Sequence, residues 1–183
     1  NILAVIPARG GSKGIPRKNI IDVCGKPLIY YAISKAKEVS KTWNMDILVS
    51  TDDEDIADIS KEYGAEVPFL RPKELSDDFT GTIPVIKHSI NWINQNVAEV
   101  KYACCIYATA PLMQVSHLQA CESLLMAEDD VDYSFPICPF PFPIQRAVGL
   151  GEGNRIYAFE PSQMIKRSQD LPDAYHDAGQ FYW

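Results

Sequence analysis

Residues 2–19 read ILAVIPARGGSKGIPRKN and determine how the rest of the chain is organised. Residues 2–7 form a continuous apolar run rich in β-branched side chains, which predicts a buried strand. A glycine- and cation-rich loop follows over residues 8–19. It holds four cations and no acid between Arg9 and Lys18, although the 183-residue chain has a net charge of −7. Such a loop, directly after a first strand, is typical of the edge at which open α/β sheets bind ligands.

This loop is suited to a polyanionic ligand. Gly10, Gly11 and Gly14 let the backbone approach phosphate oxygens, and the lysine and arginine side chains supply positive charge. The Gly-x-x-x-x-Gly-Lys spacing of a Walker loop and the Gly-x-Gly-x-x-Gly spacing of a dinucleotide loop are both absent from it. The structural alternative is a solvated basic turn.

Strand-like and helix-like segments alternate after the loop. The apolar patterns predict strands over residues 46–51, 67–71 and 102–109. Helices are predicted to open at Pro27, to span residues 52–63 with Gly64 as the stop, to begin at Thr82 as a cap, and to span residues 115–127. This alternation predicts a Rossmann-like α/β fold with a doubly wound, mostly parallel sheet.

The alternation ends after Asp132. Residues 135–143 contain four prolines among aromatic side chains, and residues 149–153 contain three glycines. Proline is poorly tolerated in a central strand, so residues 134–155 are predicted to form a small ribbon excursion, with homodimerisation as its expected role. We otherwise expect a single domain over residues 1–183. Because the chain stops inside the strand-like run 180–183, we also expect C-terminal residues beyond Trp183.

Composition limits the possible partners. The acidic balance disfavours nucleic acid and anionic membranes as partners, and no apolar run reaches the ~18 residues of a membrane span. The five cysteines form no Cys-x-x-Cys pair, and Cys104 and Cys105 are expected to be buried in the core. These features are typical of a cytoplasmic protein.

The phosphate-binding loop and several later motifs resemble the sugar cytidylyltransferases that make CMP-linked acidic sugars. The resemblance includes Gly25-Lys26-Pro27-Leu28, Val49-Ser50-Thr51-Asp52-Asp53, residues 70–75 (LRPKEL) and residues 108–112 (ATAPL). It covers essentially the whole chain. Residues 167–172 and 175–183 are similar to the pseudaminic acid branch of that family.

The resemblance implies a nucleotidyltransferase that uses CTP and an acidic nine-carbon sugar, with Mg²⁺ as cofactor. It implies that Lys18, Lys13 and Arg9 act in catalysis. The residues implied in nucleotide binding are Ala8, Arg9, Gly10, Gly11, Ser12, Lys13, Lys18, Asn19, Arg71 and Thr82, and those expected at the sugar are Tyr107, Thr109, Arg167 and Gln180. The metal ligands are unknown; in this family the usual metal aspartates come beyond the position of Trp183.

Several residues have two explanations. Arg71 and Arg167 are ligand-binding residues or surface cations, Thr82 binds nucleotide or caps a helix, and His176 is a general base or structural. Asp53-Glu54-Asp55 either begins a helix or is the Asp-x-Asp metal motif of a glycosyltransferase. The sugar also has alternatives: Tyr107 replaces the glutamine of sialic acid enzymes, which favours pseudaminic acid over N-acetylneuraminic or legionaminic acid. A nucleotide-binding module without activity is the remaining alternative.

Overall fold

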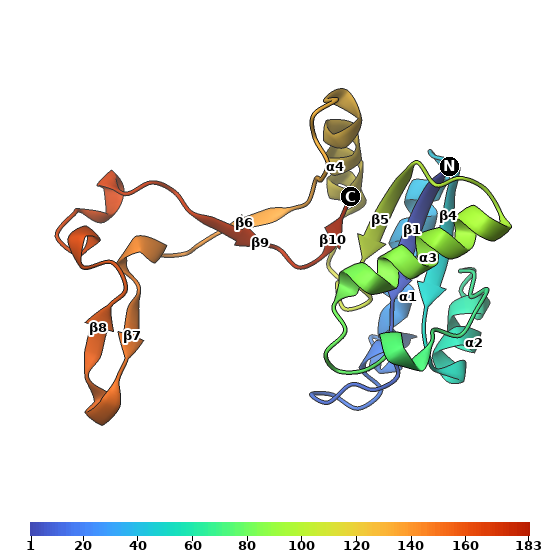
Figure 1. The fold of residues 1–183 in the computed structure, drawn as a ribbon, viewed down its shortest axis with the longest axis horizontal. Helices are drawn as coiled ribbons and strands as arrows, with labels where there is room; N and C mark the ends of the chain where they lie inside the picture. The colour runs from blue at the N-terminus through green and yellow to red at the C-terminus, as the bar shows by residue number, and fades with distance from the viewer. The chain divides into compact units, whose positions relative to one another are not determined.

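The structure is a computed structural model that describes all residues from Asn1 to Trp183. It contains two compact units (Figure 1). The larger unit comprises Asn1–Pro136 and Gly179–Trp183, and the smaller unit comprises Ile137–Ala178. No helix in either unit has the length and hydropathy needed to cross a membrane.

The larger unit is built on a four-stranded sheet in the order β10-β5-β1-β4. The strands β1 (Ile2–Pro7), β4 (Met45–Ser50) and β5 (Tyr102–Ile106) are parallel. The short strand β10 (Phe181–Tyr182) pairs antiparallel with β5, so the run 180–183 finds a partner that was not expected from the sequence. The predicted fold class, an α/β fold with a mostly parallel sheet, is confirmed.

Helices cover both faces of this sheet. Successive side chains of a strand point to opposite faces, so the continuous apolar run of β1 packs against helices on both sides. Ala4 and Ile6 pack in the cluster that contains α1 (Leu28–Ser40) and α4 (Val115–Ala127). Leu3 and Val5 pack on the other face against Ile93 of α3 (Thr82–Asn96). The expected burial of Cys104 and Cys105 is confirmed, and it raises the pKa of the Cys105 thiol to about 12.

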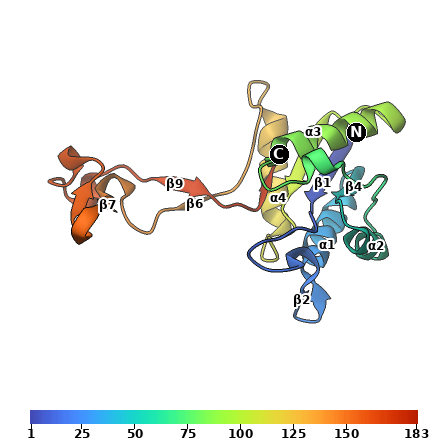
Figure 2. The ribbon, with the colours of Figure 1, turned by 60° about the horizontal axis from the view of Figure 1, so that its bottom comes forward.

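The remaining elements of the larger unit are short. A hairpin of β2 (Asp22–Val23) and β3 (Lys26–Pro27) projects beyond α1 in Figure 2. Helix α2 (Glu54–Glu62) is shorter than the predicted range 52–63 and ends before Gly64, which has φ +88°. Two 3-10 turns are η1 (Lys18–Ile20) and η2 (Lys73–Leu75).

Three sequence predictions need correction. The strand predicted over residues 67–71 is not regular: only the bridges Leu48↔Glu66 and Thr51↔Leu70 form, because Pro68 has no N–H to donate to a ladder. The strand predicted over residues 102–109 ends at Ile106. The N-cap of α3 is Gly81, and Thr82 forms no capping bond, so its hydroxyl is available for other contacts.

The smaller unit consists of two-stranded ribbons. Strands β6 (Ile137–Pro139) and β9 (Tyr175–Asp177) pair antiparallel, and β7 (Val148–Leu150) and β8 (Ile156–Ala158) form a hairpin. The predicted excursion over residues 134–155 lies mostly in this unit, which continues to Ala178. Its 3-10 turns are η3 (Ile144–Arg146), η4 (Glu152–Asn154), η5 (Pro161–Gln163) and η6 (Ser168–Asp170).

Candidate active site

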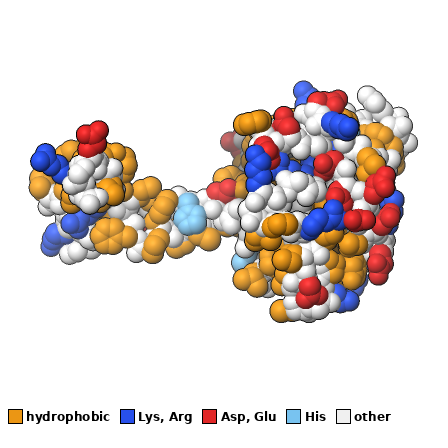
Figure 3. All heavy atoms as spheres, turned by 90° about the horizontal axis from the view of Figure 1, so that it is seen from below, with side chains coloured by type: hydrophobic (Ala, Val, Ile, Leu, Met, Phe, Trp, Pro, Cys, Tyr) orange, Lys and Arg blue, Asp and Glu red, His pale blue; other side chains and the backbone are white.

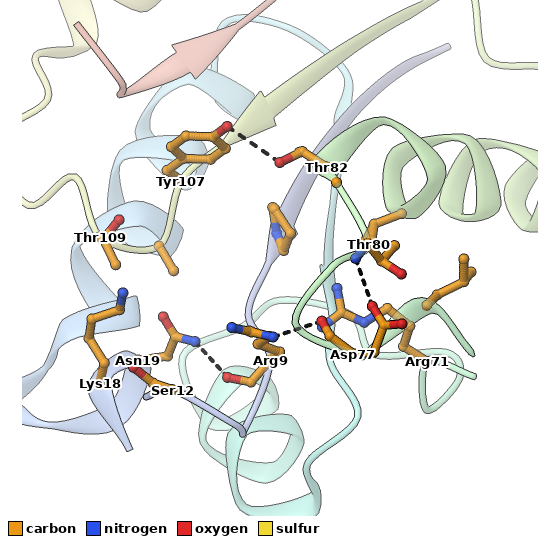
Figure 4. A pocket seen from close by; sticks show the side chains of 15 residues that line it. Arg9, Ser12, Lys18, Asn19, Arg71, Asp77, Thr80, Thr82, Tyr107 and Thr109 are labelled. Carbon is orange, nitrogen blue, oxygen red and sulfur yellow. Dashed lines mark hydrogen bonds between the residues drawn. The ribbon is translucent and has the colours of Figure 1, made fainter. Parts of the chain in front are cut away.

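A pocket of about 240 Å³ opens at the carboxyl edge of the parallel strands of the larger unit. Figure 4 shows its side chains gathered around one space from three segments: the loop after β1, the residues after β5, and residues 71–85. Eight of the residues predicted for nucleotide or sugar line it: Arg9, Ser12, Lys18, Asn19, Arg71, Thr82, Tyr107 and Thr109. The fold therefore brings together residues that are far apart in the sequence.

The loop after β1 is anchored at both ends to the first residues of α2 and the turn before it. The Gly10 amide donates to Asp52 Oδ1 at 2.9 Å, and the Arg17 guanidinium pairs with the carboxylates of Asp53 and Asp55, both at 2.6 Å. A Cβ on Gly10 would lie 2.6 Å from Asp53 Oδ2, so glycine is required for this close approach. These contacts hold the loop against α2.

These contacts also explain the acidic run after β4. Asp53 caps α2 by accepting from the Ile56 amide at 3.0 Å, and both Asp53 and Asp55 are paired with Arg17. The helix-start explanation is therefore confirmed for Asp53. The Asp-x-Asp motif has no support in this geometry, since its carboxylates are engaged by a cation of the protein itself.

Fewer backbone amides of the loop are available to a ligand than expected. The amides of Ala8, Gly10 and Ser12 already donate to groups of the chain. Asn19 is buried, and its Nδ2 donates to the Arg9 carbonyl at 2.9 Å, which closes the base of the loop. The loop therefore offers a ligand fewer free amides than its glycines suggested, and its side chains become more important for binding.

The four loop cations differ in availability. Arg17 is held by Asp53 and Asp55, whereas Arg9 and Lys13 contact Asp78. Lys18 lines the pocket, is half-buried and forms no ion pair. Its ammonium group is therefore the loop charge that is directly available to an anionic ligand.

Arg71 supplies a second positive charge from the pocket wall. It is only 5% exposed, and burial lowers the pKa of its guanidinium while Asp52 raises it. Its Nε donates a hydrogen bond to Ser76 Oγ at 3.2 Å, and its ion pair with Asp52 is long, with 3.8 Å between an Nη atom and Asp52 Oδ1. The surface-cation explanation is wrong for Arg71, because its side chain is buried. A buried and weakly paired cation favours a polar or anionic ligand.

Of the four amino-acid residues predicted to bind the sugar, two line the pocket and two do not. Tyr107 and Thr109 line the pocket, and the Tyr107 hydroxyl lies 3.4 Å from Thr82 Oγ1. Gln180 does not line it, although its backbone carbonyl accepts from the Tyr107 amide. Arg167 lies in the smaller unit, where its exposed guanidinium binds Asp170 through bonds of 2.7 and 3.0 Å. That arrangement is typical of a surface ion pair.

His176 also lies in the smaller unit. It is exposed on β9, and its ring packs edge-on against Phe140 at a centroid distance of 5.0 Å. This contact agrees with the structural explanation.

One pocket segment was missed from the sequence. Residues 75–82 contribute Leu75, Asp77, Thr80 and Gly81 to the wall beside the expected Thr82. Asp77 organises this segment by accepting from the amides of Phe79 and Thr80 at 3.0 and 2.7 Å. The mostly polar segment 76–81 lies between a predicted strand and a predicted helix at the same sheet edge, and this position could have indicated it.

Comparison with known proteins identifies the family. The cytidylyltransferase family model matches residues 3–148. The chain is 44% identical over 182 residues to a pseudaminic acid cytidylyltransferase of Campylobacter jejuni subsp. jejuni serotype O:2, covering 99% of this chain and 77% of that protein. It is 34% identical over 180 residues, 98% of this chain and 34% of the relative, to a Helicobacter pylori protein described as pseudaminic acid cytidylyltransferase and UDP-2,4-diacetamido-2,4,6-trideoxy-beta-L-altropyranose hydrolase.

Solved structures show the same fold. A CMP:2-keto-3-deoxy-manno-octonic acid synthetase complexed with CTP has a TM-score of 0.68 at 17% identity, covering 100% of this chain and 73% of that one. A 4-diphosphocytidyl-2C-methyl-D-erythritol synthase has a TM-score of 0.63 at 10% identity, with the same coverage of 100% and 73%. The chain belongs to the cytidylyltransferase family, and its fold and loop motif are those of a nucleotidyltransferase.

Lys18→Ala is expected to lower turnover by about 10²–10³, as for loss of one preorganised electrostatic group. Lys18 is the loop cation without an ion pair, so its ammonium group is directly available to the phosphates. Steady-state rates of pyrophosphate release measure the effect. Lys41→Ala, which removes an exposed cation after α1, serves as the control. Turnover within twofold of wild type in the Lys18 variant would contradict the assignment.

Proposed function

We propose that this enzyme transfers CMP from CTP to the anomeric hydroxyl of a nonulosonic acid, releases pyrophosphate, and uses pseudaminic acid as the sugar. The observation that carries this proposal is the pocket that assembles Lys18, Arg71 and Thr82 from separate segments. Support comes from the 44% identity to a relative described as a pseudaminic acid cytidylyltransferase over nearly the whole chain.

The pocket separates two tasks. We assign Lys18, with Arg9 and Lys13, to the phosphate oxygens. Arg71 and Thr82 come from the segment 71–82, where a buried cation and a hydroxyl that forms no capping bond suit the edge of cytosine. The volume of about 240 Å³ is small for a whole nucleotide, since pockets that enclose drug-sized ligands have roughly 300–1,000 Å³. The phosphates therefore extend along the loop beyond this pocket.

The reaction needs positioning and charge stabilisation more than covalent help. The anomeric oxygen attacks the α-phosphorus of CTP, the bond from that phosphorus to the bridging oxygen of pyrophosphate breaks, and the hydroxyl proton is lost. Negative charge grows on the departing pyrophosphate and on the α-phosphate oxygens. The Lys18 ammonium supplies fixed positive charge at this place.

The sugar preference is proposed from Tyr107. Its ring lines the pocket and packs at 5.4 Å from the ring of Tyr182, next to the Thr82 hydroxyl. Pseudaminic acid replaces hydroxyls of the N-acetylneuraminic acid tail with a methyl end and an extra acylamino group. An aromatic wall suits that more apolar sugar, because burying an unpartnered hydroxyl costs more than leaving a methyl pocket unfilled.

A substrate panel tests the reaction and the sugar together. With CTP and Mg²⁺, kcat/KM for pseudaminic acid is expected to exceed that for N-acetylneuraminic acid by about 10²-fold or more. Product masses and pyrophosphate release are measured. Sugar transfer from a nucleotide donor would indicate a glycosyltransferase instead, and CTP binding without turnover a binding module. Equal kcat/KM for the two sugars would contradict the sugar preference alone.

Mg²⁺ is proposed as the ion that accompanies CTP. No group of three acidic, histidine or cysteine side chains in the structure is arranged to hold a metal, so the residues present fit Mg²⁺ only as an ion bound by phosphates and water. The ion would offset phosphate charge.

Chelation is expected to abolish pyrophosphate release, and excess Mg²⁺ is expected to restore it. The physical reason is repulsion between uncompensated phosphate charges and the attacking hydroxyl. Circular dichroism with and without EDTA checks that the fold is unaffected. Undiminished rates in EDTA would show that no divalent ion is needed.

Self-association is proposed through the smaller unit, with a homodimer as the outcome. Figure 3 shows hydrophobic side chains over much of the visible face of that unit. Leu150 and Ile156 are a cross-strand pair of the β7–β8 hairpin and are 69% and 72% exposed, and Phe159 and Ile165 are exposed as well. Apolar surface gathered in this way favours contact with a second copy.

The double variant Leu150→Asp and Ile156→Asp is expected to be monomeric at tens of micromolar (about the usual assay loading), where wild type is dimeric. Charges placed in an apolar contact are costly to desolvate. Analytical ultracentrifugation gives the oligomeric state. Leu124→Asp, at an exposed leucine of α4, is the matched control and is expected to stay dimeric. Wild type that sediments as a fully active monomer would refute the dimer.

We propose that this activity is cytoplasmic, without nucleic acid or membrane as a partner. The net charge of −7 and the free state of all five cysteines support that location.

A further inference from the structure

Asp78 makes an unusual pair of contacts for a residue outside the predicted site. Its Oδ1 lies 2.8 Å from a guanidinium nitrogen of Arg9, and its Oδ2 lies 2.5 Å from the Lys13 ammonium. Arg9 and Lys13 are two of the three loop cations proposed to hold phosphates. A carboxylate thus bridges both with one oxygen each, as two oxygens of a phosphate group would.

The segment that carries Asp78 is a loop without regular secondary structure. Residues 76–81 lie between η2 and α3, and Asp77 folds them into a turn by accepting from Phe79 and Thr80. A second contact joins this turn to the phosphate loop, since Arg9 also donates to the Asp77 carbonyl at 2.7 Å. Arg9, Asp77 and Thr80 all line the pocket, so these bonds lie at its wall (Figure 4).

The Asp78 pairs are exposed to water, so breaking them costs little free energy. The side chains of Asp78 and Arg9 are 33% and 34% exposed and that of Lys13 is 77% exposed, and ion pairs in contact with water are weak. The hydrogen bond from Lys13 lowers the pKa of the Asp78 carboxyl against a partial desolvation that raises it, so the group is ionised at neutral pH. A triphosphate carries more negative charge and more acceptor oxygens than one carboxylate.

We propose that Asp78 is an internal counter-ion that competes with the phosphates of the nucleotide for Arg9 and Lys13. It leaves both cations when a triphosphate binds and pairs with them again when pyrophosphate departs. This inference rests on the proposed function, because it requires a phosphate ligand at the loop. Its consequence is that Asp78 weakens the binding of every ligand whose phosphates use these two cations, and thereby favours product release.

Asp78→Asn tests the competition, since the amide keeps the shape and loses the charge. The dissociation constants of CTP, pyrophosphate and cytidine are measured by calorimetry for wild type and variant. CTP and pyrophosphate are expected to bind about three- to tenfold more tightly to the variant, and inhibition by pyrophosphate to strengthen equally. Cytidine has no phosphates, and its affinity is expected to be unchanged.

Glu74→Gln is the matched control. Glu74 is an exposed carboxylate on the same stretch of chain that pairs with neither cation, so its loss changes the local charge alone and is expected to shift affinities less than twofold. An equal gain in this control, or unchanged or weaker CTP binding by Asp78→Asn, would overturn the inference and leave the proposed function standing. A wild-type protein that binds CTP no better than cytidine would overturn both.

Discussion

Parallel pairing of β1 with β4 is the constraint on which the site depends. Its register sets Pro7 opposite Ser50, so both strands end at the same level. The loop after β1 and the acids after β4 therefore begin side by side, and the Gly10–Asp52 and Arg17–Asp53 contacts follow from that position. Side chains on both faces of β1 are fully buried, and this packing keeps the loop at a fixed height on the sheet edge.

Charge pairing determines which loop cations are available to a ligand in this acidic protein. The chain has 24 acids and 17 lysines and arginines, and three of the four loop cations are neutralised by nearby carboxylates. Only Lys18 remains unpaired, next to the buried and weakly paired Arg71. The acidic background thus concentrates the available positive charge at one pocket, which favours an anionic ligand there.

The sequence predicts elements well where local physics determines them. Residues 2–7 and 115–127 form the expected strand and helix, because continuous apolar runs and 3.6-residue periodicity carry that information. Asp53 caps α2, as its place in an acidic helix start suggested. The error over residues 67–71 arises at Pro68, whose missing N–H outweighs the apolar pattern around it.

The sequence predicts which residues line the site, but it does not predict which of the loop cations form ion pairs with acids. Eight predicted residues line the pocket, since a motif after a strand is placed at the sheet edge by the fold itself. Asp78 could not be found in this way. Its role depends on a non-local contact across 65 residues to Lys13 and 69 to Arg9, and a two-acid run in a loop gives no local sign of its partner. Arg17 was counted among the available cations for the same reason.

The loop cations therefore differ in how readily they become available to a ligand, and this difference comes from the rigidity of their acidic partners. Arg17 pairs with Asp53, whose side chain is only 17% exposed and is fixed by its capping bond to α2, so this pair is a lasting part of the scaffold. Arg9 and Lys13 pair with Asp78 on a loop, where the partner can move without unfolding a helix. Lys18 pairs with neither Asp53 nor Asp78. An acidic enzyme that must hold a highly charged substrate and then release a highly charged product gains from this order: one cation anchors the loop, one is always available, and two become available only when a stronger anion arrives.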